Sequence, residues 1–137
     1  MRDSLYYGEI KYVIDDRQLA AEVFLDLAQK VWPGSYNKEM TQNALGKTVN
    51  VTAWNNDVLV GCVRILTDGY YFGTIPEILV MPEYQNSGIG KKLMELAWEA
   101  SPTSLFFGAQ PGNEVFFEKL DFTKSMQSYE KKKERNP

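Results

Sequence analysis

Hydrophobic and polar positions recur along this chain with two different periods, and the two periods separate strands from helices. Period-two alternation and short apolar runs predict strands at Glu9–Ile14, Val49–Ala53, Val58–Leu66, Leu105–Phe107 and Phe122–Tyr129, with one more strand that carries Ile78–Met81. Asn55–Asp57 and Asp68–Gly69 are typical of the turns that join such strands into hairpins. Pro76 has no N–H to donate, so we expect an irregular or edge strand at that point.

Apolar residues at helical spacing predict four helices. The first is expected to begin at an N-cap in Asp15–Asp16 and to stop at Trp32, before Pro33–Gly34. Its apolar face is expected to consist of Leu19, Val23, Leu27 and Val31. The other helices are predicted at Asn37–Leu45, ended by Gly46, from Gly88 to about Ala100, and at Asn113–Leu120. This order of elements predicts an α/β (α+β) fold, with a mixed, mostly antiparallel twisted sheet flanked by helices.

Composition restricts the classes of protein that this chain can be. With 137 residues it is expected to form a single domain, 1–137, that is large enough for a core without disulfides. The one cysteine, Cys62, lies in the apolar run Val58–Leu66 and is interpreted as a buried packing residue rather than a nucleophile. A reducing, cytoplasmic compartment agrees with this cysteine usage.

The chain contains no histidine. This absence removes the commonest general base and the usual zinc ligand, so no metal site is expected and acid–base chemistry falls to carboxylates, tyrosines or water. The net charge of -3 gives no basic field for nucleic acid, and the locally basic segment 130–137 is interpreted as a solvated terminus. No run of eighteen apolar residues predicts a membrane span or a secretion signal.

The most informative segment is the glycine-rich turn 85–92, between the apolar strand and the helix that begins near Gly88. Glycines at 88 and 90 allow a ligand to approach the backbone, and the free N–H groups of a first helical turn attract an anion. A tight turn without a ligand is the alternative. The segment is not a Walker A loop, because Gln85 and Lys92 stand where that motif has Gly and Ser or Thr, and it lacks the third glycine of a dinucleotide fingerprint.

Gln85, Gly88 and Gly90 match the acetyl-coenzyme A loop of the GNAT acetyltransferases, which reads Gln or Arg, two residues, Gly, one residue, then Gly or Ala. The segment Phe116–Phe122 also resembles the closing Phe-Tyr-Glu-Lys-Leu-Gly-Phe motif of that family. The resemblance extends from about Ile10 to about Lys131. It implies an N-acetyltransferase that moves an acetyl group from acetyl-coenzyme A to a primary amine, expected to be a small molecule, by direct attack in a ternary complex.

The resemblance also implies a cofactor site. The residues expected to bind acetyl-coenzyme A are Ile78, Leu79, Val80, Gln85, Asn86, Ser87, Gly88, Ile89, Gly90, Lys91, Asn113, Phe116 and Phe117. Within this set, the N–H groups of 86–91 are expected to bind the pyrophosphate. Those of Ile78 and Val80 are expected to face the acetyl end, where two strands diverge and the free amides act as oxyanion donors.

The residues expected to take part in catalysis are Glu77, Ile78 and Tyr129. Glu77 is the candidate base, since a carboxylate among apolar neighbours would be partly desolvated, with a pKa raised toward neutrality. Phe117 stands where many members of the family have a tyrosine that protonates the thiolate. Tyr129, Tyr84 or a water molecule must therefore supply that proton, or the thiolate leaves unassisted.

The sequence specifies the acceptor amine less well. Aromatic residues at Trp32, Tyr36 and 70–72 are expected, by resemblance, to surround the acceptor, where they would suit an amine with an apolar or aromatic body, such as an arylalkylamine. Core packing and scattered surface positions explain most of these aromatic residues equally well. Polyamine, amino-sugar and protein amines stay open, as do a monomer and a homodimer. Two other hypotheses are a non-catalytic acyl-coenzyme A binding or sensing module and a dimeric interaction domain with a vestigial loop.

Overall fold

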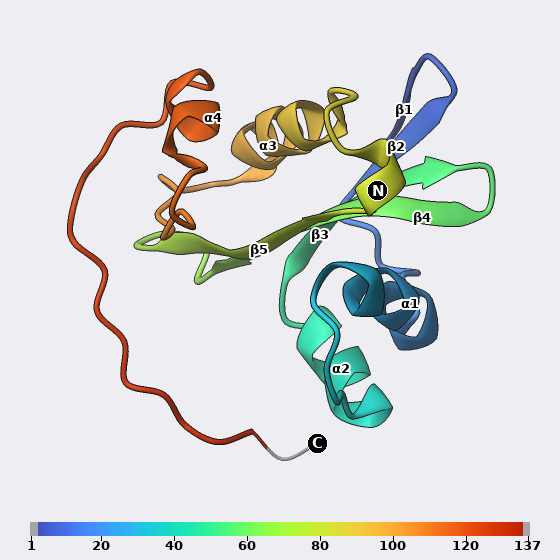
Figure 1. The fold of residues 1–137 in the computed structure, drawn as a ribbon, viewed down its shortest axis with the longest axis horizontal. Helices are drawn as coiled ribbons and strands as arrows, with labels where there is room; N and C mark the ends of the chain where they lie inside the picture. The colour runs from blue at the N-terminus through green and yellow to red at the C-terminus, as the bar shows by residue number, and fades with distance from the viewer. Residues whose placement is uncertain (1–2, 136–137) are drawn as a thin grey trace.

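The computed structural model describes residues 3–135 and contains one five-stranded antiparallel sheet with the strand order β1-β2-β3-β4-β5 (Figure 1). The ends of the expected domain, residues 1–2 and 136–137, lie outside the described residues. The strands are β1 (Asp3–Tyr7), β2 (Ile10–Ile14), β3 (Val49–Asn55), β4 (Val58–Thr67) and β5 (Gly73–Val80). The expected fold class, a mostly antiparallel sheet flanked by helices, is confirmed.

Two hairpin turns arrange the last three strands. Asn56 has φ 54° between β3 and β4, a left-handed conformation that Asn tolerates better than most residues. Between β4 and β5, Oδ1 of Asp68 accepts hydrogen bonds from the N–H groups of Tyr70, Tyr71 and Phe72, at 2.9, 2.8 and 3.1 Å. Both turns fall where the sequence predicts them.

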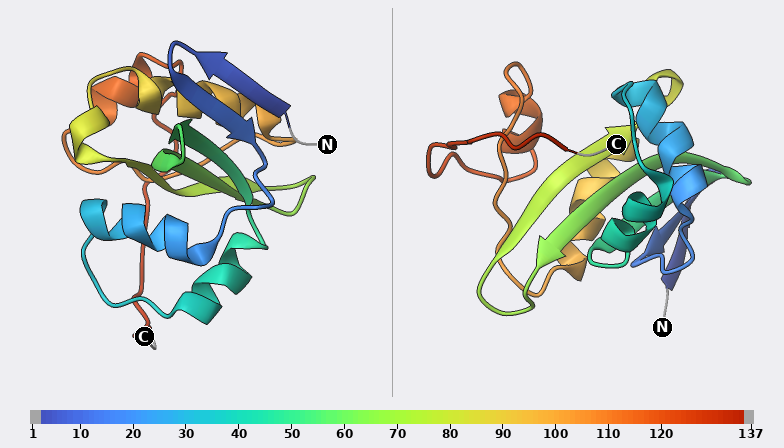
Figure 2. Two further views of the ribbon diagram at one scale, coloured as in Figure 1. Left: turned by 90° about the vertical axis from the view of Figure 1, so that its right-hand side faces the viewer. Right: turned by 90° about the horizontal axis from the view of Figure 1, so that it is seen from below.

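Helices cover both faces of the sheet (Figures 1 and 2). On one face lie α1 (Ala21–Val31) and α2 (Lys38–Leu45), and on the other lie α3 (Ile89–Ala100) and α4 (Glu114–Glu118), with a short 3-10 turn at Pro82–Tyr84 before α3. Gly61 of β4 lets α3 approach closely, since a Cβ there would lie 3.0 Å from Leu93 Cδ1 and 3.1 Å from Ile89 Cγ2. This close packing fixes the start of α3 relative to the sheet.

The predicted start of the first helix is wrong. The helix begins at Ala21 rather than near Asp16, and its N-cap, Ala20, makes no side-chain cap. Gln42 of α2 takes over this role, because its Oε1 accepts from Ala21 N–H at 2.7 Å and its Nε2 donates to Leu19 O at 3.2 Å. The buried face of α1 is formed by Ala21, Phe24, Leu27 and Ala28, so of the predicted helical face only Leu27 is among its buried residues.

Asp16 is instead a buried residue, only 4% exposed. Its Oδ2 accepts a hydrogen bond from Thr52 Oγ1 at 2.8 Å, and its Oδ1 accepts from Gln18 N–H at 3.1 Å. Thr52 Oγ1 in turn accepts from Trp54 Nε1 at 2.8 Å. The carboxylate thus ties the segment before α1 to β3 instead of capping the helix.

The C-terminal part departs most from expectation. The predicted strand Leu105–Phe107 is reduced to an isolated parallel bridge between Phe106 and Thr74, and the predicted helix Asn113–Leu120 to Glu114–Glu118. The predicted strand Phe122–Tyr129 is absent, because this segment has no regular structure (Figure 1). The sequence prediction also missed β1, which pairs with β2 at the N-terminal edge of the sheet. Within residues 3–135 no helix has the length and apolarity to cross a membrane.

Candidate functional site

The glycine-rich loop forms the turn that the sequence predicts. Asn86 and Gly88 have φ values of 64° and 91°, so the chain passes twice through the left-handed region before α3 begins at Ile89. The side chain of Ser87 donates from Oγ to the Tyr84 carbonyl and closes the turn. The predicted N-terminal boundary of the helix is thus correct to within one residue.

This turn leaves a run of backbone donors free. Gln85 N–H donates to Pro82 O at 3.3 Å, and the next bonded amide is that of Lys92, which donates to Gly88 O at 3.0 Å. Between them, the six N–H groups of 86–91 have no hydrogen-bond partner among the described residues. Unpaired donors at the positive end of a helix dipole are the usual elements of an anion site.

Strand β5 contains a bulge at the proline that the sequence marked as irregular. Arg64 pairs with Glu77 and Leu66 with Thr74, so that Ile65 alone lies opposite both Ile75 and Pro76. One extra residue reverses the direction in which the following backbone groups point. The strand also lies at the edge of the sheet, as predicted.

The reversal decides where the amides after the bulge point. Met81 N–H donates to Val60 O on β4 at 2.8 Å, and backbone groups alternate in direction along a strand. The N–H groups of Ile78 and Val80 therefore point away from β4, toward the open edge. The carbonyl of Val80 points the same way, since it accepts from Gln85 Nε2 at 3.1 Å.

The open edge of β5 adjoins the loop. The segment around Phe106 lies beside β5. Among the described residues, its backbone bonds to β5 only near the bridge at Thr74, where Ile75 N–H donates to Phe106 O at 3.1 Å. Farther along, Gly90 faces β5, because a Cβ on it would lie 3.7 Å from Val80 Cγ2 and 3.5 Å from Phe116 Cζ. Val80, Gly90 and Phe116, all predicted cofactor residues, are therefore brought together.

Glu77, the predicted base, extends from β5 to the face that carries α1 and α2. Its Oε1 accepts from Arg64 Nε at 2.8 Å, and the two side chains are 27% and 18% exposed. Oε2 has no hydrogen-bond partner among the described residues. The guanidinium of Arg64 also lies over the ring of Phe24, 5.7 Å from its centroid.

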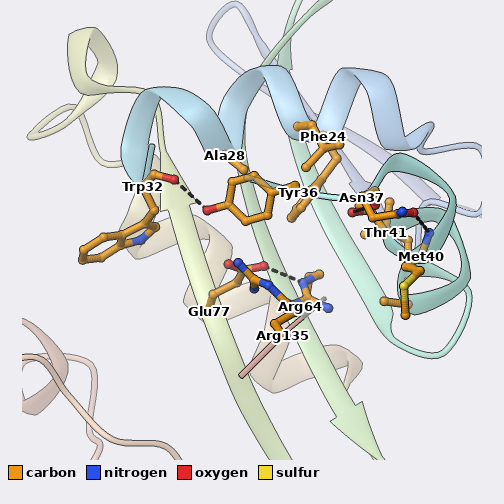
Figure 3. Close-up of a pocket in the computed structure, with 13 residues that line it drawn as sticks. Phe24, Ala28, Trp32, Tyr36, Asn37, Met40, Thr41, Arg64, Glu77 and Arg135 are labelled. Carbon is orange, nitrogen blue, oxygen red and sulfur yellow. Dashed lines mark hydrogen bonds and ion pairs between the residues drawn. The ribbon is translucent and has the colours of Figure 1, made fainter. Parts of the chain in front are cut away.

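The ion pair forms the floor of a cavity of about 330 Å³ between α1, α2, β4 and β5 (Figure 3). Its labelled lining residues are Phe24, Ala28, Trp32, Tyr36, Asn37, Met40, Thr41, Arg64, Glu77 and Arg135. Tyr36 is held by its hydroxyl, which donates to Trp32 O at 2.6 Å. The volume falls in the lower part of the range for small-molecule sites.

Three of the five aromatic residues expected around the acceptor lie elsewhere. Trp32 and Tyr36 line the cavity, but Tyr70, Tyr71 and Phe72 lie in the β4–β5 turn and are 78%, 83% and 49% exposed. Sequence reasoning missed Arg64 and Arg135. Arg64 could have been noticed as the one charged residue in the apolar run 58–66. Arg135 carries no such signal, because it belongs to a basic segment.

The closing motif packs as an aromatic cluster. The ring of Phe117 makes edge contacts with Phe107, Phe116 and Phe122, at centroid distances of 4.7, 5.1 and 6.4 Å. Phe116, not Phe117, is the member beside Gly90. In the same motif, Asp121 adopts φ 68°, the left-handed conformation that the glycine of the family motif would take freely.

Two other residues of the predicted site, Tyr129 and Asn113, are not among those that the fold brings together near the loop and the cavity. Tyr129 lies in the irregular C-terminal segment and is 89% exposed, with its hydroxyl 3.4 Å from Gln127 Oε1. Asn113 is the exposed N-cap of α4 and makes no side-chain cap. A second, more open cleft of about 700 Å³, between α3 and residues 119–125, includes only Lys91 of the predicted site.

The geometry joins two chemically different spaces across one strand. Free loop and strand amides lie on the edge of β5 near the start of α3, and a carboxylate beside a small cavity lies on the opposite face of the same strand. Backbone N–H groups can hold a phosphate and polarise a carbonyl, and a carboxylate can accept a proton. The arrangement can therefore bring an activated acyl group and a small nucleophile together at the strand edge.

Comparison with known proteins agrees with this geometry. The family model described as an acetyltransferase (GNAT) domain matches residues 14–135. The curated protein of Gibberella zeae named "Putative acetyltransferase FG08082" is 33% identical over 86 residues, which is 60% of this chain and 47% of that protein. The chain thus spans about half the length of the curated relative that it matches.

Solved structures share the fold. The GNAT-family acetyltransferase SP0256 of Streptococcus pneumoniae TIGR4 superimposes with a TM-score of 0.68 at 24% identity, covering 90% of this chain and 99% of that chain. AAC(6')-Iy, solved with the bisubstrate analogue CoA-S-monomethyl-acetylneamine, gives a TM-score of 0.63 at 15% identity, covering 84% of this chain and 92% of that chain.

Proposed function

Because this chain belongs to the GNAT acetyltransferase family, we propose that it moves an acetyl group from acetyl-coenzyme A to the primary amine of a small molecule by direct attack in a ternary complex. The observation that carries the proposal is a set of backbone N–H groups without a hydrogen-bond partner among the described residues. Six of them belong to 86–91, and two, those of Ile78 and Val80, lie on β5 next to the loop at Gly90. The related fold of AAC(6')-Iy holds a coenzyme A conjugate, which agrees with this use of the amides.

The loop amides bind the pyrophosphate, and the groups at the strand edge bind the acetyl end. The N–H groups of Ile78 and Val80 point to the open edge and donate to the thioester oxygen as it gains charge. One such donor is worth roughly 3 to 4 kcal/mol in other acyl-transfer enzymes. Gly90 leaves room for the pantetheine arm between α3 and β5, beside Phe116 and Val80, while Gln85 orders the loop through Val80 O.

Glu77 takes the proton that the amine must lose. An alkylammonium has a pKa near 10, so only about one molecule in a thousand is nucleophilic at neutral pH. The unengaged Oε2 of Glu77 faces the cavity in which the amine would lie and receives the proton directly or through water. The amine nitrogen then forms a bond to the acetyl carbon, and the carbon–sulfur bond breaks.

The leaving thiolate needs no tyrosine from the closing motif. Phe117 has no proton to donate, and Tyr129 is exposed in the C-terminal segment. A thiol with a pKa near 8.5 leaves as a thiolate and takes its proton from water. We therefore propose that solvent, rather than Tyr129, supplies this proton.

Turnover tests the proposal. The protein is mixed with acetyl-coenzyme A and a set of primary amines, and free thiol is followed with a chromogenic reagent. We expect thiol release that depends on both amine and enzyme. A protein that binds acetyl-coenzyme A but releases no thiol with any amine would support the non-catalytic binding module instead.

A further inference from the structure

The charges that line the cavity select among amines. The titratable lining residues are Tyr36, Arg64, Glu77 and Arg135. Arg64 and Glu77 form a close ion pair at 2.8 Å and offset each other. Arg135 has no ion-pair partner among the described residues, so the lining residues that the structure describes carry one net positive charge.

Arg135 is oriented by an aromatic ring. Its guanidinium carbon lies 5.0 Å from the centroid of the Tyr36 ring, and Tyr36 is itself fixed by its bond to Trp32 O. Figure 3 shows Arg135 close to the Arg64–Glu77 pair, across the cavity from α1. A guanidinium stacked on a ring keeps its N–H fork free for a planar anion such as a carboxylate.

A positive cavity disfavours acceptors with several positive charges. Polyamines and aminoglycosides would meet the unpaired charge of Arg135 and find only one carboxylate, that of Glu77, which Arg64 already engages. Like charges placed close together oppose binding. An acceptor with one ammonium and one carboxylate would instead match both Glu77 and Arg135.

The remaining lining sets the body of the acceptor. Phe24, Ala28, Trp32 and Met40 provide apolar surface on the side of α1 and α2. A cavity of about 330 Å³ suits a single small molecule with an apolar side group rather than an oligosaccharide or a protein segment.

We infer that the acceptor is an amino carboxylate with an apolar or aromatic side group, and that Arg135 recognises its carboxylate. This inference rests on the proposed acetyl transfer at the same site. It replaces the broader expectation of an arylalkylamine, polyamine, amino-sugar or protein amine with one class of substrate.

Three matched acceptors test the inference: phenylalanine, phenylalaninamide and phenethylamine, with spermidine as a polycation. For the wild type we expect kcat/KM to be roughly ten- to a hundredfold higher for phenylalanine than for phenethylamine, which is the range for one charge-assisted hydrogen bond. Arg135→Gln should bring this ratio close to one, mainly through KM, and Arg135→Lys should restore part of it. Lys133→Gln, the same loss of charge at an exposed position of the same segment, should leave the ratio unchanged.

The two proposals fail in different ways. If amines are acetylated but phenethylamine or spermidine is used as well as phenylalanine, or if Arg135→Gln keeps the wild-type ratio, the inference is overturned while the acetyltransferase stands. If no amine is acetylated, the proposed function fails, and calorimetric titration of phenylalanine decides the recognition alone. Binding that Arg135→Gln weakens at least tenfold supports recognition of the carboxylate, and absent or equal binding overturns it.

Discussion

A glutamate at Gly88 tests the loop as the diphosphate site, and Gly69 supplies a matched control. The two glycines have φ values of 91° and 89°, and a Cβ on either would meet no atom within 4 Å. Gly88→Glu and Gly69→Glu therefore impose the same backbone strain, about 1 to 2 kcal/mol for a residue with a side chain in this region. They differ in place, because Gly69 lies in the β4–β5 turn.

The effect on stability without cofactor should be alike in the two variants. For a domain of 137 residues, 1 kcal/mol corresponds to a change in Tm of roughly 4 °C. Each variant should therefore lose roughly 4 to 8 °C. A crowded core would add to this cost, but neither position has neighbours that must move.

The effect on cofactor binding should separate them. At a hundred times its Kd, acetyl-coenzyme A adds about 2.7 kcal/mol to the stability of the wild type. A carboxylate at about 5 Å from each charge of the diphosphate costs roughly 0.8 to 1.7 kcal/mol per charge at effective dielectric constants of about 80 to 40. Two such charges weaken binding about a hundredfold, which leaves a stabilisation of only about 0.4 kcal/mol.

Differential scanning fluorimetry with and without acetyl-coenzyme A measures both effects in one experiment. We expect a rise in Tm of roughly 10 °C for the wild type and for Gly69→Glu, and of less than about 2 °C for Gly88→Glu. If Gly88→Glu gains as much as Gly69→Glu, the free amides of 86–91 do not hold the diphosphate and the reasoning from the loop geometry is wrong.

Three further predictions concern single side chains. Glu77→Gln should lower kcat at neutral pH by about a hundredfold, which is the low end of the range for general-base catalysis, and should leave the Kd for acetyl-coenzyme A unchanged. If the variant has the same pH–rate profile as the wild type, another group is the base. Burial raises the pKa of the Cys62 thiol, so in the folded protein it should not react with a thiol reagent at pH 8, and rapid labelling before denaturation would contradict its full burial. Hydrogen bonds from the amides of Tyr70, Phe72 and Tyr71 lower the pKa of Asp68. At pH values above the ordinary aspartate pKa, the Asp68 carboxylate therefore stabilises the β4–β5 turn, and this stabilisation is lost as the pH falls through the lowered pKa. The protection factors of the Tyr70 and Tyr71 amides, which compare their exchange rates with the intrinsic rates at the same pH, should therefore fall in acid. At pH 7 these amides should exchange faster in Asp68→Ala than in the wild type, and equal exchange in the two proteins would refute the role of these bonds.

The sequence was sufficient where local chemistry decides the structure. The hairpin turns at Asn55–Asp57 and Asp68–Gly69, the irregularity at Pro76 and the start of α3 all follow from conformational preferences of residues at those positions. The helix start at Asp16 failed because a contact distant in sequence, to Thr52, satisfies that carboxylate, while Gln42 caps α1 from another helix. Periodicity cannot reveal a partner 36 residues away.

The residues of the candidate site also fall into two groups, those that the local sequence predicts and those that it does not. Loop amides near Gly88 and the partly buried Glu77 follow from a local motif and a local apolar environment. Arg135 reaches the cavity only through the path of the irregular C-terminal segment, which no hydrophobic pattern marks. In the segment predicted as the strand Phe122–Tyr129, Phe122 packs with Phe107 and Phe117, but Met126 and Tyr129 are exposed. The alternation of apolar residues in this segment therefore does not correspond to a buried strand face.

The most direct measurement of the central claim follows the acetyl group itself. Protein in excess is mixed with acetyl-coenzyme A carrying an isotopically labelled acetyl group and with phenylalanine, phenethylamine and spermidine in separate reactions, and all products are identified by mass spectrometry. We predict that the label appears on the amine nitrogen of an acceptor in an amount equal to the free coenzyme A formed. Recovery of intact labelled acetyl-coenzyme A from every reaction, with no labelled amine, would contradict the claim that this chain is an N-acetyltransferase acting on small primary amines.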